Sequence, residues 1–404
     1  MFVESAPTHD LFAPNFIEDP YPAYAAMLDR DPYFDESARS WVLTRYSDVQ
    51  PALRSSRFSQ ARFAERMERA LGSGPLAECV DQWLLFRDPP DHTRLRALVN
   101  QAFTPKAVER LRHAIQRIVD DLISVARQAG RMDVIAELAY PLPVLVICEL
   151  LGVPAADRRC FAARSAALAE SLDALSTHDQ EIVRRGNAAV EGLAAYFREL
   201  VHKRRVAPGD DVLSGLIAAR DGHNRLTEDE LIATCIFLFF AGHETTVNLI
   251  GNGLLALLRH PREMHRLLDD PRLIGNAVEE LLRFDSPVQR TARTLEHDMW
   301  MGSQRAQRGQ RVMFLLGAAN RDPRRFLMPD RLNIGRTDAI HHVSFGGGIH
   351  YCVGAPLARL EAQIAIGSLV RGLPGLRLVE ATPTWRQTYL LRGLKRLHVT
   401  FSMS

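Results

Sequence analysis

One cysteine of this sequence stands where a metal ligand could form. Cys352 comes just before a helix-like pattern in which Pro356 fits the first turn. A cysteine in that place lies near the positive end of the helix dipole and its unbonded N–H groups, which favour the thiolate over the thiol. A thiolate is a good iron ligand, and N–H groups donating to the sulfur would tune the iron. The alternative interpretation is a free cysteine buried beside a glycine-rich turn.

A second feature is an acid with two hydroxyls inside an apolar helix that we expect from about Thr227 to Arg259. It carries Ala241-Gly-His-Glu-Thr-Thr, and its Gly242 costs a helix about 1 kcal/mol, which indicates a packing or functional reason. A Thr245 hydroxyl that bonds back to a carbonyl one turn earlier can open a bulge where a small molecule such as water fits. Glu244 and Thr245 could then relay protons. The alternatives are an ion-paired or solvated carboxylate and a hydroxyl bonded to the helix backbone.

Composition and charge narrow the class of protein. The 404 residues are 47% apolar and 24% charged, and a net charge of +2 gives no global field for nucleic acid or an anionic membrane. The apolar stretch Leu231–Phe240 is shorter than the ~20 residues that span a bilayer, so it predicts a core helix and no membrane. The N-terminus lacks signal-peptide regions, so we expect a cytoplasmic protein. Five cysteines without close pairs suit a reducing compartment, with neither a disulfide framework nor a zinc site.

The elements that must position these residues are mostly helices. Apolar residues recur at helical spacing over 107–128, 178–205, 228–259 and 272–284. Short strand-like runs occur at Ser40–Thr44, Arg311–Leu316 and Leu397–Phe401. No long linker and no internal repeat divides the chain, so we expect one domain over 1–404, mainly α with a small β region.

The segment around the cysteine carries a specific spacing. Glycines let its backbone turn sharply and approach a bulky ligand closely, at Gly346, Gly347, Gly348 and Gly354. The pattern Phe345-x-x-Gly348-x-His350-x-Cys352-x-Gly354 resembles the haem-binding signature of the cytochrome P450 family at every fixed position. The resemblance extends from Asp19-Pro-Tyr-Pro to Leu391-Arg-Gly-Leu and is strongest to soluble bacterial members. It implies a single-domain cytochrome P450 fold with haem b, whose iron Cys352 ligates.

Haem propionates need cationic or hydrogen-bonding partners. His92 and Arg96 are four residues apart on one predicted helix face and could grip the same carboxylate. The resemblance implies further cofactor-binding residues, so that the full expected set is His92, Arg96, Ala241, Arg293, Phe345, Gly346, His350, Cys352 and Gly354. Arg290 lies near Arg293, and which of the two faces the haem stays open.

The resemblance also implies a structural clamp and a proton relay. Glu280 and Arg283 are spaced for an ion pair, which on an exposed helix adds only about 0.2–0.5 kcal/mol. In the family this pair is buried and completed by a later arginine, which Pro329-Asp-Arg331 offers. Glu244 and Thr245 match the family's acid and threonine, so they are the expected catalytic residues.

Substrate and electron donor follow from the same resemblance. The substrate wall would use 61–85, 165–190, 288–291 and 389–391, with contacts from Phe240, Val288, Gln289 and Leu390, although core packing explains such apolar residues equally well. An apolar small molecule is implied. The chain has no flavin or ferredoxin segment, so an acidic ferredoxin or flavodoxin with its reductase would supply electrons, and Arg94, Arg110 and Arg112 are candidates for meeting it. We expect a monomer.

The favoured function is a monooxygenase that uses dioxygen to hydroxylate or epoxidise its substrate. Oxidative coupling or desaturation is an alternative that the sequence does not separate. A haem sensor or carrier without turnover is another, although a sensor has no need of the acid–threonine pair. The presence of that pair also speaks against a peroxide-driven variant.

Overall fold

The computed structural model describes residues 14–30, 32–60, 71–158, 161, 164, 167–168, 170–171, 179–222, 224–388 and 390–402. The chain divides into two compact units. The sheet unit comprises Met1–Ser59, Asn252–Tyr351 and Thr382–Arg396, and the helical unit comprises Gln60–Gly251, Cys352–Ala381 and Leu397–Ser404. The expectation of one domain over 1–404 stays a prediction. Residues 61–70, much of 165–178, Cys160 and Tyr389, to which the sequence interpretation referred, lie outside the described residues.

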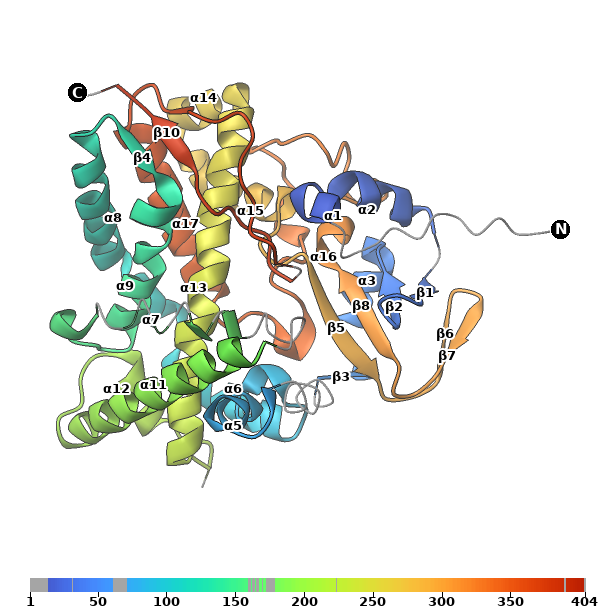
Figure 1. The fold of residues 1–404 in the computed structure, drawn as a ribbon, viewed down its shortest axis with the longest axis vertical. Coiled ribbons are helices and arrows are strands. Elements are labelled where there is room, and N and C mark those ends of the chain that lie inside the picture. The colour runs from blue at the N-terminus through green and yellow to red at the C-terminus, as the bar shows by residue number, and fades with distance from the viewer. Residues whose placement is uncertain are drawn as a thin grey trace. The chain divides into compact units, whose positions relative to one another are not determined.

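The helical unit is built from helices of very different length (Figure 1). They are α5 (Pro75–Asp81), α6 (Asp91–Ala102), α7 (Pro105–Glu109), α8 (Arg112–Arg127), α9 (Pro141–Leu150), α11 (Gln180–Val206), α12 (Val212–Ala218), α13 (Glu228–Arg259) and α17 (Ala355–Gly372). Shorter turns are the 3-10 helices Leu84–Phe86 and Ala155–Asp157 and the π-helix Ile135–Ala139. A small antiparallel sheet places β10 (His398–Thr400) between β4 (Arg131–Asp133) and β9 (Arg377–Leu378).

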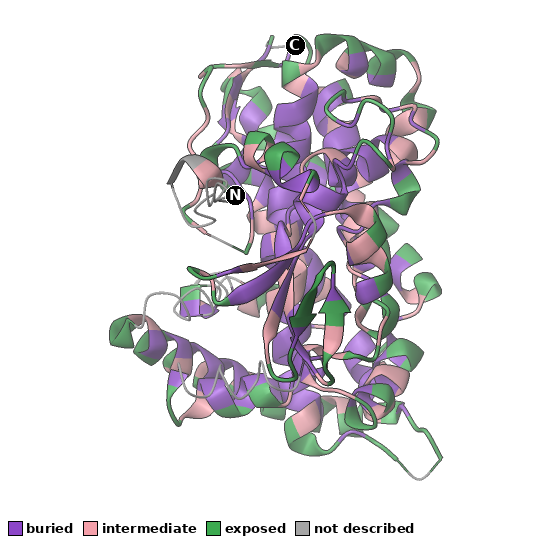
Figure 2. Ribbon diagram, turned by 90° about the vertical axis from the view of Figure 1, so that its right-hand side faces the viewer, coloured by how far each residue is buried: buried purple, intermediate pink, exposed green. Residues whose placement is uncertain are grey.

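Amphipathic spacing explains why these helices pack. Along α8, buried Ile115, Val119, Ile123 and Ala126 recur every three or four residues, and α17 packs against this helix. Such helices show buried residues along one face and exposed residues along the other (Figure 2). At the start of α11, the Asp179 carboxylate accepts hydrogen bonds from the N–H groups of Glu181 and Ile182, which caps the helix.

Helix α13 is the most apolar long element. Among the described residues it alone is long and apolar enough to cross a membrane, and 72% of its most apolar window is buried inside the protein. Residues Leu231–Phe239 are buried without interruption. This is the burial of a core helix, as the sequence predicts. Residues 252–259 of α13 belong to the sheet unit.

The sheet unit is organised on a five-stranded sheet in the order β1-β2-β8-β5-β3 (Figure 1). Its strands are β1 (Tyr33–Asp35), β2 (Ser40–Leu43), β3 (Phe58–Ser59), β5 (Arg290–Leu295) and β8 (Arg311–Leu315). Only the pairing of β2 with β8 is parallel, with Ser40 opposite Arg311. Strands β6 (Met299–Met301) and β7 (Gln304–Ala306) form a separate hairpin.

Helices and short turns complete the sheet unit. They are α1 (Pro14–Glu18), α2 (Tyr21–Leu28), α3 (Tyr46–Ala52), α14 (Pro261–Asp269), α15 (Ile274–Phe284), α16 (Leu316–Ala319) and the 3-10 turns Pro271–Leu273, Ala339–His341 and Gly348–His350. The core of this unit packs Trp41, Val312 and Phe314 of the sheet against Val49 of α3.

The predicted elements are largely confirmed. The three strand-like runs contain β2, β8 and β10, and the fold is mainly α with small sheets. The predicted continuous helix 107–128 is wrong in one respect: α7 ends at Glu109 and α8 begins at Arg112. Val108 and Leu111 on the two sides of this break are both buried, so the chain turns there to keep both in the core.

Candidate active site

Cys352 lies at the amino-terminal end of α17. Burial raises the pKa of its thiol, whereas the N–H groups of Gly354 and Ala355 and the charges of Arg96 and Arg359 act to lower that pKa. These donors and cations would stabilise a thiolate, and a bound metal cation would offset the cost of burying its charge. A soft sulfur ligand with N–H donors beside it fits a haem iron. The local arrangement around Cys352 is therefore the one that the sequence predicts.

The glycine-rich segment that precedes Cys352 belongs to the sheet unit. Gly346 and Gly348 have φ values of +71° and +64°, which favour glycine. At Gly348 a Cβ would lie 2.7 Å from the Leu53 carbonyl oxygen, so this glycine is required by close packing on the end of α3. Gly354 has an ordinary φ of −81°. Close approach to a ligand is thus not what Gly348 is needed for, because its neighbour is this chain's own backbone.

The rings of the signature lie near this segment. Phe345 is half-buried, and its ring centroid is 5.6 Å from that of His342 and 6.2 Å from that of Tyr351. His350 is half-buried at the end of the 3-10 turn Gly348–His350. The structure thus presents Phe345–Tyr351 in the sheet unit and Cys352–Gly354 in the helical unit.

Helix α6 brings His92 and Arg96 onto one face, as predicted. Burial and the charge of Arg96 lower the pKa of His92, which favours the neutral form of its ring. Burial also lowers the pKa of Arg96, and the negative charge of a Cys352 thiolate opposes that shift. Arg96 Nε donates to Asn100 Oδ1 at 3.2 Å. A cation and a neutral imidazole side by side suit the binding of one carboxylate.

The middle of α13 has the predicted hydroxyl geometry. The Thr245 hydroxyl donates to the Ala241 carbonyl oxygen at 3.0 Å. Ala241, Gly242 and Thr245 are partly exposed in a helix whose neighbouring residues are buried. A Cβ at Gly242 would meet only Ile147 Cδ1, at 3.5 Å, so packing does not require glycine there. The small residues leave open space beside this turn, which fits a bulky cofactor and dioxygen.

His243 in the same turn was missed by the sequence interpretation. It is fully buried, and its Nε2 lies 3.2 Å from the Tyr140 carbonyl oxygen. Because a carbonyl only accepts, Nε2 must carry the proton. The Tyr140 ring also meets the His243 ring edge-on, with centroids 4.4 Å apart. The available signal was a histidine inside an otherwise apolar helix beside the predicted acid.

Phe240 forms part of an aromatic cluster in the helical unit. Its ring stacks on Trp83, with centroids 5.3 Å apart and planes 20° from parallel. Trp83 also contacts Phe86 and Phe237. The Trp83 side-chain N–H interacts with the Cys79 sulfur and acts to lower the pKa of that thiol. This cluster offers an apolar wall at the position predicted for Phe240.

The other predicted substrate residues belong to the sheet unit. Leu390 is 49% exposed, and its carbonyl oxygen accepts from the N–H of Gln289. Gln289 is buried, and its Oε1 accepts from the Tyr24 hydroxyl at 3.0 Å. Val288 pairs with Leu391 in an isolated β-bridge. Hydrogen bonds inside this unit therefore occupy the Gln289 amide, and its contact with a substrate stays a prediction.

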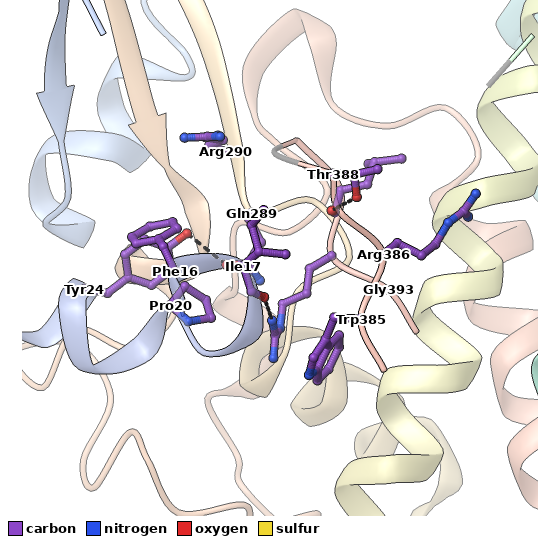
Figure 3. Close-up of a pocket in the computed structure, with 12 residues that line it drawn as sticks. Phe16, Ile17, Pro20, Tyr24, Gln289, Arg290, Trp385, Arg386, Thr388 and Gly393 are labelled. Carbon is purple, nitrogen blue, oxygen red and sulfur yellow. Dashed lines mark hydrogen bonds between the residues drawn. The ribbon is translucent and has the colours of Figure 1, made fainter. Parts of the chain in front are cut away.

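A small cavity of the sheet unit includes Gln289 in its wall (Figure 3). Its volume of about 20 Å³ holds water rather than a substrate. Arg290 also lines it, with Nη1 4.0 Å from Met313 Sδ. Arg293 instead donates to Thr291 Oγ1 at 3.0 Å. An odd separation of three residues along β5 places Arg290 and Arg293 on opposite faces of the strand, so only one of them can face a given ligand.

The buried clamp contains a different third arginine from the one predicted. Glu280 and Arg283 are fully buried and form two bonds of 2.7 and 2.9 Å. Arg336 completes the network, with Nε 3.1 Å from Glu280 Oε1. Arg331 is exposed and contributes only its carbonyl oxygen, which accepts from Arg336. The prediction of Arg331 is therefore wrong. The Arg336 N–H donates to the Asn333 carbonyl and closes a turn, and this turn brings the Arg336 side chain back to Glu280.

The arginines suggested for the electron donor are already engaged. Arg94 pairs with Glu230, Arg110 with Asp210 and Arg112 with Glu109. A partner's carboxylates would have to compete with these carboxylates of the same chain. The contribution of these arginines to docking stays a prediction. Because each is paired with a carboxylate of the same chain, it offers a partner less net positive charge than the sequence alone indicates.

The arrangements at Cys352 and in the middle of α13 fit a haem-thiolate enzyme, and comparisons with known proteins show the family. The cytochrome P450 family model matches residues 34–373. The vitamin D(3) 25-hydroxylase of Pseudonocardia autotrophica is 43% identical over 402 residues, covering 97% of this chain and 96% of the relative.

Two solved structures extend the likeness to the fold. CalO2 matches with a TM-score of 0.92 and 37% identity, covering 98% of this chain and 99% of that one. P450BioI, in complex with hexadec-9Z-enoic acid ligated acyl carrier protein, matches at 0.88 and 38%, covering 96% and 99%.

The chain belongs to the cytochrome P450 family. It is a monooxygenase with a haem iron cofactor, and it takes its electrons from a redox partner.

Proposed function

We propose that Cys352 ligates the iron of haem b and that Glu244 and Thr245 supply protons during oxidation of an apolar small molecule. The observation that carries this proposal is the placement of Cys352 beside the N–H groups of Gly354 and Ala355 and near Arg96. When bound, the haem supplies an iron at which dioxygen is activated. The remaining chemistry falls to the chain's own side chains.

The cofactor's carboxylates would be held by cations and histidines. His92 and Arg96 share a face of α6, and the charge of Arg96 interacts with that of a Cys352 thiolate. Arg293 and His350 are proposed as the second pair, on the family pattern. We favour Arg293 over Arg290, because Arg290 faces the small cavity with Tyr24 and Gln289. Phe345, Gly346, Gly354 and Ala241 would contact the ring, since they flank the thiolate or the open turn of α13.

Proton supply rests on the geometry of α13. The Thr245 hydroxyl gives its hydrogen to the Ala241 carbonyl, which leaves the oxygen lone pairs to accept another. Glu244, the next residue towards the amino terminus, is buried and provides an acid in an otherwise apolar wall. A positioned acid typically accelerates a proton-transfer step by about 10²- to 10⁴-fold. Here that gain would appear as reducing equivalents that end in oxidised product rather than in hydrogen peroxide.

The substrate is proposed to be apolar, with Phe240, Val288, Gln289 and Leu390 near it. The stacked rings of Phe240 and Trp83 support an apolar wall. The relatives named for vitamin D(3) and for a carrier-bound unsaturated fatty acid act on or bind largely hydrocarbon molecules. Hydroxylation or epoxidation of such a molecule is the proposed reaction. The electron donor is proposed to be a ferredoxin or flavodoxin with its reductase, meeting a cytoplasmic monomer.

The test uses the purified holoprotein with a surrogate ferredoxin and reductase. Apolar ligands that shift the haem absorption band would be selected from fatty-acid, steroid, terpenoid and aromatic panels. We expect ligand-dependent oxygen consumption and a product that carries one ¹⁸O atom from ¹⁸O₂. A product without ¹⁸O would favour coupling or desaturation, and normal haem loading without ligand-dependent turnover would contradict the proposed function.

A further inference from the structure

Asn248 of α13 is a polar side chain buried among apolar ones. It is 1% exposed, and its Oδ1 has no hydrogen-bond partner among the residues that the structure describes. Its chain neighbours Val247, Leu249 and Ile250 are apolar and equally buried. Leaving an amide oxygen unpaired in such surroundings is costly, so a buried oxygen of this kind indicates a missing partner such as water.

The position of Asn248 on the helix indicates what that partner serves. It follows Glu244 by four residues and Thr245 by three, so all three side chains share one face of α13. Side chains of a helix lean towards its amino terminus. The amide of Asn248 therefore lies over the turn that carries both residues proposed for proton transfer.

Counting donors and acceptors identifies the partner of the Asn248 oxygen. The Oδ1 atom only accepts, so it needs an O–H or N–H donor. The Thr245 hydroxyl already donates to the Ala241 carbonyl and cannot be that donor at the same time. A water has two O–H groups and two lone pairs. One O–H can bond to Asn248 while the other points to Thr245 Oγ1, and a lone pair remains to accept from Glu244.

We propose that Asn248 holds a water molecule between Glu244 and Thr245 and so positions the proton relay; this inference rests on the proposed function of those two residues. Glu244 passes its proton to the water, and the water passes one of its own to the Thr245 oxygen. The hydroxyl proton that Thr245 had donated to the Ala241 carbonyl gives up that bond and leaves towards dioxygen, the co-substrate of the reaction, and the incoming proton replaces it on the Thr245 oxygen. Glu244 is left as a carboxylate and takes a new proton from solvent. Asn248 is a positioning residue, because it exchanges no proton itself.

Asn252 provides a matched comparison one turn further along the same helix. It is as buried as Asn248, but its Nδ2 donates to the Arg392 carbonyl at 2.9 Å within the sheet unit. Its Oδ1, like that of Asn248, has no hydrogen-bond partner among the described residues, but the bond from its Nδ2 gives the side chain a structural role. The two asparagines share residue type, helix, burial and an oxygen unpartnered in the described part of the chain. They differ in that Asn252 is anchored through its Nδ2 and lies two turns, rather than one, beyond Glu244 and Thr245.

The experiment compares N248L, N248D and N252L in the holoprotein with a fixed ligand, ferredoxin and reductase. We expect N248L to bind haem, to lose about tenfold in product formed per reducing equivalent and to show a larger solvent deuterium isotope effect than the parent. N248D keeps an acceptor oxygen and should recover most of the coupling, with a shifted pH profile. N252L should unfold at a lower temperature with the parent's isotope effect and coupling.

A crystal structure supplies a readout that does not depend on turnover. We expect an ordered water about 2.8 Å from Asn248 Oδ1 in the parent and none in N248L. A dry Oδ1, a protein donor on it, or parent-like coupling and isotope effect in N248L would each overturn the inference. If the parent shows no turnover with any ligand, the proposed function fails, whereas the crystallographic water still decides whether Asn248 holds one.

Discussion

Two buried polar groups of this protein are treated in opposite ways. In the sheet unit, Glu280 receives hydrogen bonds from Arg283, from Arg336 and from the Asn333 N–H, so its carboxylate is saturated by the chain. In the helical unit, the Asn248 Oδ1 on α13 receives none from the described residues. Both groups are buried, where an unpaired polar atom is costly.

The number of hydrogen bonds that the protein makes to a buried polar group indicates the role of that group. A network in which every donor and acceptor is used holds one arrangement and resists change, which suits a clamp. A turn that keeps an acceptor open, beside a threonine and an acid, can bind and exchange small molecules. We therefore expect substitutions in the clamp to lower stability and substitutions in the α13 turn to impair proton transfer.

The largest effect is expected at the thiolate, on which all chemistry of the α13 turn depends. Cys352→Ala should abolish the thiolate-type absorption of the reduced carbon monoxide complex, because no other residue in its loop offers a sulfur ligand. Absorption spectroscopy of the reduced protein measures it. Cys79→Ala is the control, since burial raises the pKa of that thiol to about 12 and keeps it protonated. An unchanged spectrum in Cys352→Ala would remove the ligand assignment.

The clamp should give the next largest effect, on folding. Glu280→Ala strands two buried arginines, so we expect the free energy of unfolding to fall by about 3–5 kcal/mol and soluble holoprotein to be scarce. Arg336→Ala should be severe for the same reason, whereas exposed Arg331→Ala should stay within about 0.5 kcal/mol of the parent. Urea unfolding compares the three. Equal effects of the two arginine variants would contradict the corrected clamp.

Thr245→Ala should break the other half of the comparison. We expect normal folding and haem content, but a fall of roughly 100-fold in coupled product, with reducing equivalents diverted to hydrogen peroxide. Peroxide and product are quantified together against NADPH consumed. The neighbouring Thr246, buried on another face of α13, supplies the control Thr246→Ala, which should stay coupled. Intact coupling in Thr245→Ala would mean that the relay is misassigned.

The smallest expected effect concerns His243, which ties the α13 turn to the Tyr140 carbonyl. His243→Phe keeps the ring contact and loses the hydrogen bond, so we expect about 1 kcal/mol less stability. His243→Gln places an amide N–H near the former Nε2 and should recover part of it. Denaturant unfolding of both variants decides, and identical losses would show that the hydrogen bond contributes nothing measurable.

The sequence by itself determined the features that depend on short spacing. The run from Phe345 to Gly354 predicts a thiolate ahead of a helix, and Cys352 lies there beside the start of α17. The four-residue spacing of Ala241 and Thr245 predicts their back-bond, which forms at 3.0 Å. Helical period and β-propensity placed α11, α13, α15 and the strands β2, β8 and β10 within a few residues. These features follow from backbone geometry over one or two turns, which the sequence encodes directly.

Only the tertiary structure decided which distant groups meet. It replaced Arg331 by Arg336 in the clamp, and it put Arg290 beside Tyr24 and away from the face of Arg293. It also paired Arg94 with Glu230 across more than a hundred residues of sequence. No local pattern encodes such meetings, because they depend on where long-range packing brings each backbone. For the same reason, nothing in the sequence distinguishes Asn248 from other polar residues. It becomes a candidate for function only because the structure leaves its Oδ1 without a hydrogen-bond partner among the described residues.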